Sequence, residues 1–257
     1  MQVILGIYRV IVATIYLAVF GVGALFISAI FFNLLSLVIK DKQKKVRISR
    51  TFTSASFRLY LKSGELIGIF KFNFHNLDKL KNDQKVIYIA NHPSLLDFVI
   101  LTAIGKNTSC VVKNSLKKNP FFSGVISCNQ YIGNHGSSEQ IVQRCKDELE
   151  KGSCLMIFPE GTRTRNQSNL KFTHGFSSIA LTNNYNIRPF VINFKGRALR
   201  KGAPWYLTYY SRLYYDIEVL DLFDTKKFVQ QYQDKEISAQ SRILAKQLQN
   251  IIQSKVA

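Results

Sequence analysis

Acidic residues are scarce in this chain. Its 257 residues include 16 Asp and Glu against 35 Lys and Arg, which leaves a formal net charge of +19. A surplus of this size favours an acidic partner, and nucleic acid and anionic lipid are the two common classes. The sequence contains no zinc-ligand spacing and no nucleic-acid-binding motif, so we expect no nucleic-acid partner.

Cysteine is also rare, and none of it is arranged in pairs. The four cysteines are Cys110, Cys128, Cys145 and Cys154. Without a CxxC pair, the common zinc and thiol-redox motifs are excluded. We expect small, buried side chains in a reducing compartment. A GxSxG motif is missing too, which argues against a serine hydrolase.

Charge is absent from one long segment near the N-terminus. The residues from Val10 to Ile39 carry none, and as one helix they would span ~45 Å, more than the roughly 30 Å hydrocarbon core of a bilayer. The segment is too long for the apolar region of a signal peptide, and no A-x-A-like cleavage site follows it. We therefore predict a retained membrane anchor, either one tilted span or two shorter helices broken near Gly21 and Gly23 that dip into one leaflet.

A basic collar follows the apolar segment. Against one acid, Asp41, it contains Lys40, Lys42, Lys44, Lys45, Arg47 and Arg50. Positive residues beside a span favour the cytoplasmic side, and each cation near an anionic surface contributes about 1 kcal/mol. A solvated basic linker is the alternative interpretation. We divide the chain into an anchor with its collar, residues 1–50, and a domain at residues 51–257 on the cytoplasmic face of a membrane, the inner membrane in a bacterium.

The remainder alternates between strand-like and helix-like segments. We expect strands at 71–75, 85–90, 108–113, 153–158 and 188–194, one or two more within 206–219, and helices at 93–104, 119–127, 137–150, 175–184 and 236–254. Strands that alternate with helices predict an α/β fold with a central mixed, mostly parallel sheet flanked by helices. The N-terminal membrane-embedded helical segment adds to this domain.

The segment Asn91 to Asp97 is the first chemical motif. It places His92 five residues before a carboxylate, directly after a predicted strand. Neither a strand nor a continuous helix brings these two side chains to one face, since five helical steps rotate roughly 140°. We predict that His92 lies in the strand-to-helix turn and Asp97 in the first turns of a helix that starts at Pro93. The carboxylate then holds one ring nitrogen and leaves the other free as a base.

The second motif runs from Phe158 to Arg165, after another apolar run. Here a strand end carries Glu160, a glycine and two arginines. The planar arginine fork matches phosphate oxygens, and ligands of α/β sheets bind at such strand ends. We therefore expect both motifs to face one site.

Together, the two motifs resemble the glycerolipid acyltransferase family of the lysophosphatidic acid acyltransferase type. The family pattern is NHxxxxD followed by FPEGTR, and both blocks are intact here, as Asn91 to Asp97 and Phe158 to Arg163. The resemblance covers roughly residues 70–200. It implies an enzyme of phospholipid synthesis that moves an acyl chain from acyl-CoA or acyl carrier protein to a hydroxyl of a lysophospholipid such as 1-acylglycerol-3-phosphate. No cofactor beyond this co-substrate and no metal is expected.

The resemblance implies a role for each site residue. His92 removes the hydroxyl proton, and Asp97 fixes the histidine tautomer. Backbone N–H groups in the turn after the strand are candidates for stabilising the oxyanion. The acyl tail requires an apolar groove, expected beside helix 93–104 or near Phe121 and Phe122. The expected substrate contacts are Asn91, Lys113, Glu160, Gly161, Thr162 and Arg163, with Arg163 on the anionic group of the acceptor.

One position departs from the family pattern. The family usually has an arginine, thought to contact the acceptor phosphate, where this chain has Asn134. Arg163, Arg165 or Lys113 can compensate, or the acceptor differs. A second hypothesis therefore keeps the chemistry with a specialised chain on a carrier protein or a non-phosphate lipid acceptor. A third is a non-catalytic membrane-binding protein.

Overall fold

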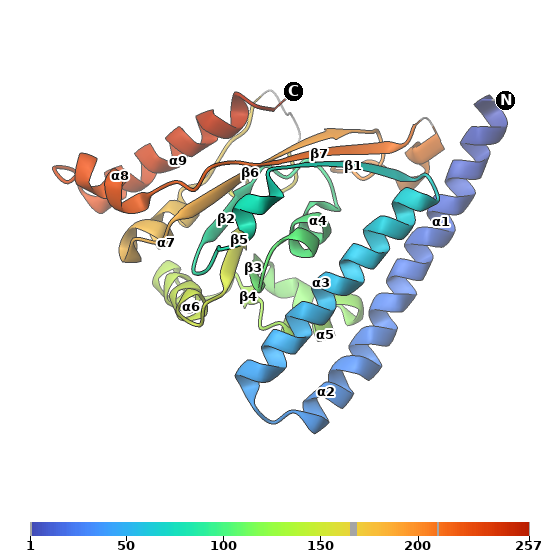
Figure 1. Cartoon of the computed structure of the whole chain (residues 1–257), viewed down its shortest axis with the longest axis horizontal. Helices are drawn as coiled ribbons and strands as arrows, with labels where there is room; N and C mark the ends of the chain where they lie inside the picture. The colour runs from blue at the N-terminus through green and yellow to red at the C-terminus, as the bar shows by residue number, and fades with distance from the viewer. Residues whose placement is uncertain (1, 165–168, 210, 257) are drawn as a thin grey trace.

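One mixed sheet organises the fold (Figure 1). The computed structural model describes residues 2–164, 169–209 and 211–256. Its seven strands follow the order β1-β7-β6-β2-β5-β3-β4. All pairs between neighbouring strands are parallel except β6 with β7, which confirms the predicted α/β class. The strands are β1 (Phe70–His75), β2 (Ile87–Ala90), β3 (Thr108–Val112), β4 (Ile132–Gly133), β5 (Cys154–Ile157), β6 (Ile187–Lys195) and β7 (Leu213–Val219).

Helices cover both faces of this sheet (Figure 1). On one face lie α3 (Lys42–Leu66), α4 (Asp97–Ile104) and α5 (Pro120–Cys128). On the other lie α6 (Ser138–Glu150), α7 (Gly175–Asn183) and α9 (Ile237–Gln253). Strands that are covered by helices on both faces carry apolar side chains on both sides. Strand β2, with the sequence Ile-Tyr-Ile-Ala, fits this pattern.

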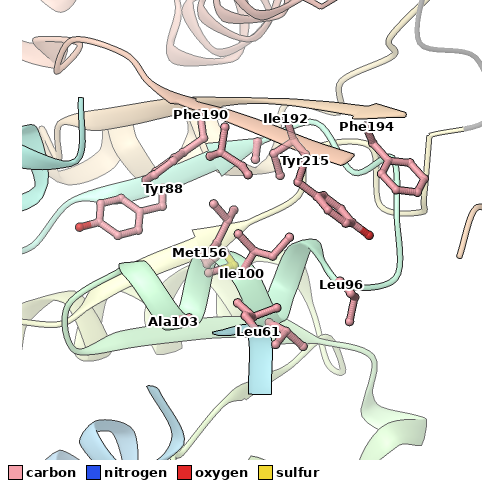
Figure 2. Packing of buried hydrophobic residues seen from close by; sticks show 14 of the residues in the cluster. Leu61, Tyr88, Leu96, Ile100, Ala103, Met156, Phe190, Ile192, Phe194 and Tyr215 are labelled. Carbon is pink, nitrogen blue, oxygen red and sulfur yellow. The ribbon is translucent and has the colours of Figure 1, made fainter. Parts of the chain in front are cut away.

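Strand β2 contributes alternate side chains to two separate cores. Tyr88 and Ala90 belong to the core under α3 and α4, whereas Ile87 and Ile89 belong to the core under α7 and α9. All four are fully buried. Figure 2 shows the first core, where Tyr88 packs below Phe190 of β6. Each large apolar side chain buried in this way contributes about 1.5–3 kcal/mol, so the strand that carries His92 at its end is firmly held.

The apolar N-terminal segment forms one continuous helical rod. It consists of α1 (Gln2–Phe26), a π-helical turn η1 (Ile27–Phe31) and α2 (Phe32–Val38). Helix α1 runs through Gly21 and Gly23, so of the two arrangements predicted for this segment the one with a break near these glycines is wrong. A glycine costs a helix only about 1 kcal/mol relative to alanine, which is too little to interrupt so apolar a helix. By length and composition alone, Val3–Val38 is able to cross a membrane.

Helix α3 returns antiparallel along this rod. Aromatic contacts hold the two together, with Tyr16 stacked on Tyr60 and Phe31 stacked on Phe52. The basic collar forms the first turns of α3, whose N-cap Asp41 accepts a hydrogen bond from the Lys44 N–H. The boundary drawn at residue 50 thus falls inside a helix.

The segment 206–219, predicted to hold one or two strands, contains one among its described residues, β7. Residues Trp205–Tyr209 form a 3₁₀ helix, η4, that packs against α1. The short strand β4 was not predicted. A short helix, α8 (Thr225–Gln231), follows β7 and is N-capped by Asp224. Further 3₁₀ turns are η2 (Leu77–Leu80) and η3 (Asn114–Lys118). The other predicted elements are present, and α6 begins with a capping box on Ser137.

A buried ion pair fastens α3 to the domain. The Arg50 guanidinium donates to Glu148 Oε1 of α6, to Ser153 Oγ and to the Asn129 carbonyl, each at 2.7 Å. Both charged side chains are almost fully buried. Burial alone would raise the pKa of Glu148, but Arg50 and Ser153 outweigh it and hold the pKa below its usual value. The helical hairpin and the domain are therefore one folded unit at this point.

Removal of one partner of this pair should be costly. We expect Glu148→Ala to lower the free energy of unfolding by about 3–5 kcal/mol, because it leaves the Arg50 charge buried and unpaired. The matched control is Asp234→Ala, which removes an exposed ion pair with Lys235 and should cost less than about 1 kcal/mol. Urea unfolding in detergent measures both. Equal effects of the two substitutions would contradict the anchoring role of the pair.

Candidate active site

The two sequence motifs meet at one edge of the sheet. Strands β2, β5, β3 and β6 are mutually parallel, so their carboxyl ends lie on the same edge. His92 follows β2, Glu160 follows β5 and Lys113 follows β3. Ligands of open α/β sheets bind at this edge.

His92 and Asp97 form the predicted pair. His92 Nδ1 lies 2.8 Å from Asp97 Oδ2. The Asp97 side chain is fully buried, while that of His92 keeps 19% of its surface exposed. With Nδ1 held by the carboxylate, Nε2 is the ring nitrogen available for a substrate proton.

Helix α4 begins later than the sequence predicted. It starts at Asp97, four residues beyond Pro93. The cause is Ser94, whose backbone N–H and hydroxyl donate to the two oxygens of Asp97 at 2.7 and 2.6 Å. This local turn competes with helix formation and leaves His92 in the turn, as predicted, with Asp97 as the first helical residue.

Residues of the second motif contact His92 of the first. Phe158 stacks on the His92 ring, with ring centroids 4.1 Å apart. Glu160 Oε1 accepts from the His92 N–H at 2.9 Å and from the Thr164 hydroxyl at 2.5 Å. The Thr164 N–H donates to the His92 carbonyl at 2.7 Å. Glu160 therefore orders the turn around the histidine. Burial raises its pKa, and the bonds from Thr164 and His92 only partly offset the rise.

Asn91 fills a positioning role. It is fully buried, its amide donates to the Ile192 carbonyl, and its carbonyl accepts from the Ile192 N–H, each at 2.8 Å. This geometry differs from the substrate contact that the sequence suggested. Asn91 extends the pairing of β2 with β6 to the position just before His92.

The other predicted substrate contacts lie around this centre. Gly161 has φ of +64°, a left-handed conformation that favours glycine. Arg163 Nη1 donates to the carbonyls of Leu199 and Arg200, and Thr162 Oγ1 accepts from Lys201 Nζ at 2.6 Å.

Lys113 and Asn134 form no hydrogen bond with the catalytic pair in the part of the chain that the structure describes. Lys113 is exposed at the end of β3. Asn134 Oδ1 accepts from the Asn114 N–H at 3.0 Å and so fastens a loop. Arg165 lies outside the described residues.

The turn does not offer the expected oxyanion donors. The N–H of His92 donates to Glu160, that of Ser94 to Asp97 and that of Leu95 to the Leu199 carbonyl. The Leu96 N–H donates to Ser94 Oγ, and Pro93 has none. These groups are already used within the protein, so the expectation that they stabilise the oxyanion is wrong.

The sequence analysis assigned no role to four residues that contact the catalytic turn: Phe158, Thr164, Ser94 and Tyr215. The first three lie within the two motifs, so the motifs already indicated that they lie near the site. Tyr215 comes from β7 and donates to Ser94 Oγ at 3.1 Å. Burial raises its pKa well above the usual value, which keeps the donating proton in place. Nothing in the sequence links it to the motif.

The raised pKa of Glu160 predicts a pH-dependent stability difference. Where a carboxyl group has a raised pKa in the folded state, the folded protein loses stability as pH rises through that pKa, because the buried group ionises. Glu160→Gln keeps the oxygen that accepts from His92 and Thr164 but cannot ionise. The variant should therefore gain stability relative to the wild type as pH rises from about 4 to 8, measured by urea unfolding. A stability difference between Glu160→Gln and the wild type that stays constant over this pH range would contradict the assignment.

Known proteins share the sequence pattern around this site. Residues 71–193 match the family model "Acyltransferase". A 1-acyl-sn-glycerol-3-phosphate acyltransferase of Helicobacter pylori is 30% identical over 193 residues, which are 73% of this chain and 71% of that protein. One from Cocos nucifera is 34% identical over 128 residues, or 48% of this chain. The chain matches only about two fifths of the length of the coconut and chloroplast relatives.

The fold also has a solved counterpart. The crystal structure of the 1-acyl-sn-glycerophosphate (LPA) acyltransferase PlsC from Thermotoga maritima superposes with a TM-score of 0.67 and 19% identity, over 99% of this chain and 95% of that one. At this identity the likeness shows the fold. The extended match to the Helicobacter pylori protein shows more, and the chain belongs to the family of 1-acyl-sn-glycerol-3-phosphate acyltransferases.

Proposed function

We propose that this protein transfers an acyl chain from acyl-CoA or acyl carrier protein to the free hydroxyl of 1-acylglycerol-3-phosphate. The observation that carries the proposal is the His92–Asp97 pair, with Nδ1 held by a fully buried carboxylate and the ring partly exposed. The motif supplies a base without a protein nucleophile, so the nucleophile is the acceptor hydroxyl. The acyltransferase relatives support the same reaction.

The reaction then proceeds in one addition and one elimination. His92 Nε2 takes the hydroxyl proton as the oxygen attacks the thioester carbonyl. Asp97 stabilises the imidazolium that forms. The tetrahedral intermediate collapses, the C–S bond breaks, and the thiolate leaves and takes the proton from the His92 imidazolium, which restores the base. No acyl-enzyme and no metal is needed, because the thioester is already activated.

The N-terminal rod supports a membrane location. Most of its apolar side chains are exposed, and burial of such a surface in lipid is favourable. The basic collar at the start of α3 suits anionic headgroups. We place the protein on a membrane with its catalytic domain on the cytoplasmic face.

An apolar cavity of about 300 Å³ suits an acyl chain. It lies between α1, η1 and α3, and Val125 of α5 also lines it. The groove was expected beside helix 93–104 or near Phe121 and Phe122. Among the described residues, none of helix 93–104 lines this cavity, whereas α5, the helix that contains Phe121 and Phe122, contributes Val125. The lining residue Phe57 contacts Phe98 of α4. We assign the acyl tail to it.

The test is an acyl-transfer assay with lysophosphatidic acid and acyl-CoA. His92→Ala should reduce turnover by about 10²–10⁴-fold, and Asp97→Asn should cause a similar loss because the tautomer is no longer fixed. The matched control is His75→Ala, which removes an exposed histidine paired with Asp216 on the outer strands and should leave turnover unchanged. Vesicle binding should persist in all variants. Survival of transfer in His92→Ala would refute the general-base role.

Another acceptor is the second candidate. Asn134 stands where the family usually has an arginine, and a lyso-ornithine lipid O-acyltransferase of Pseudomonas aeruginosa is 28% identical over 127 residues, 47% of this chain. Turnover with a non-phosphate lipid, or only with a specialised acyl carrier protein substrate, would favour this candidate. Vesicle binding without transfer to any acceptor would favour a non-catalytic membrane protein.

A further inference from the structure

The loop that follows β6 forms a wall of the active site. Its Leu199 carbonyl accepts from the Leu95 N–H at 3.0 Å and from Arg163 Nη1 at 3.2 Å. One backbone atom therefore ties this loop to the turn between His92 and Asp97 and to the FPEGTR segment. The sequence motifs do not include this loop.

Leu199 holds this position in a strained conformation. Its φ is +64° and its side chain is buried. A left-handed conformation is unfavourable for a non-glycine residue and persists only where the surroundings impose it. Here Arg200 braces the loop from inside, since its guanidinium donates to the carbonyls of Gly196 and Phe194. The bracing fixes where the next residue, Lys201, projects.

Lys201 reaches the FPEGTR segment. Its Nζ donates to Thr162 Oγ1 at 2.6 Å, and the residue is exposed. An ammonium has three donors, so two remain after this bond. Within the described residues no carboxylate forms an ion pair with Lys201 or Arg163. In that same part of the chain, the bonds of Arg163 use only Nη1.

Two cations without a carboxylate partner among the described residues, Arg163 of the FPEGTR segment and Lys201 of the loop after β6, thus lie at the FPEGTR segment beside the catalytic turn. Glu160, the carboxylate of that segment, points to the His92 backbone and does not neutralise them. Such a pair attracts an anionic group with several oxygens. We propose that Lys201, with the remaining nitrogens of Arg163, binds the anionic headgroup of the lipid acceptor and sets specificity for it. The proposal rests on the proposed acyl transfer and deepens it.

Lys201 also supplies the positive charge that is missing at Asn134, where the family usually has an arginine. The Asn134 side chain fastens the loop at Asn114, so that position brings no charge to the site. A lysine held by a threonine hydroxyl keeps its full charge, because the partner is neutral. The cation for the acceptor therefore comes from the loop after β6, on the other side of β2 from β4 in the sheet order.

The test separates binding from chemistry. Lys201→Ala should raise the KM for lysophosphatidic acid about 10- to 100-fold, with kcat and the KM for acyl-CoA nearly unchanged. Lys201→Arg should restore most of the affinity. The matched control is Lys246→Ala, which removes an exposed lysine of α9. This variant should behave as the wild type.

Other outcomes would overturn the proposal. A raised KM for acyl-CoA with an unchanged KM for the acceptor would place Lys201 at the donor. A fall in kcat alone would make the loop a structural support. Equal effects of Lys201→Ala and Lys246→Ala would show that Lys201 contributes only to the general positive charge of the surface.

Direct binding keeps this test independent of catalysis. Calorimetric titration of detergent-solubilised protein with lysophosphatidic acid should show weaker binding for Lys201→Ala than for Lys246→Ala, even if the wild type turns over no such acceptor. That pattern without turnover would reject the proposed acceptor reaction and support the headgroup site. Equal binding by both variants would reject the site itself.

Discussion

The carboxylate of Asp97 is the group on which the active site depends. It is fully buried, and it interacts with the Ser94 N–H, the Ser94 hydroxyl and the His92 ring. A buried charge persists only when such partners compensate for its lost hydration. The same contacts that make the charge tolerable also fix the imidazole and delay the start of α4. Stability and catalytic geometry therefore have one origin here.

Around this carboxylate, three loops from neighbouring strands hold one another. The FPEGTR segment after β5 binds the His92 backbone through Glu160 and Thr164. The loop after β6 binds both of the others through the Leu199 carbonyl. A site built in this way is preorganised, since no member moves without breaking bonds to the other two. It also explains why Glu160 carries a raised pKa: the residue is placed for its acceptor oxygen, at the cost of burying a charge.

The N-terminal helices depend on a different kind of contact. Aromatic stacking joins α1 and η1 to α3, while the buried Arg50–Glu148 pair joins α3 to the domain. The apolar rod therefore meets the catalytic domain through α3, and it also packs against α5 and η4. An apolar cavity lies where the rod meets α3.

The sequence by itself determined the class of fold, the two motifs and the pairing of His92 with Asp97. These features are local: a strand period, a helix period and a five-residue spacing are properties of neighbouring residues. Tertiary structure decided what the spacing could not. It turned Asn91 and Glu160 into positioning residues, used up the N–H groups of the turn, and brought Tyr215 and Lys201 to the site. Those contacts join residues distant in the chain, and only the packed sheet selects which strand ends become neighbours.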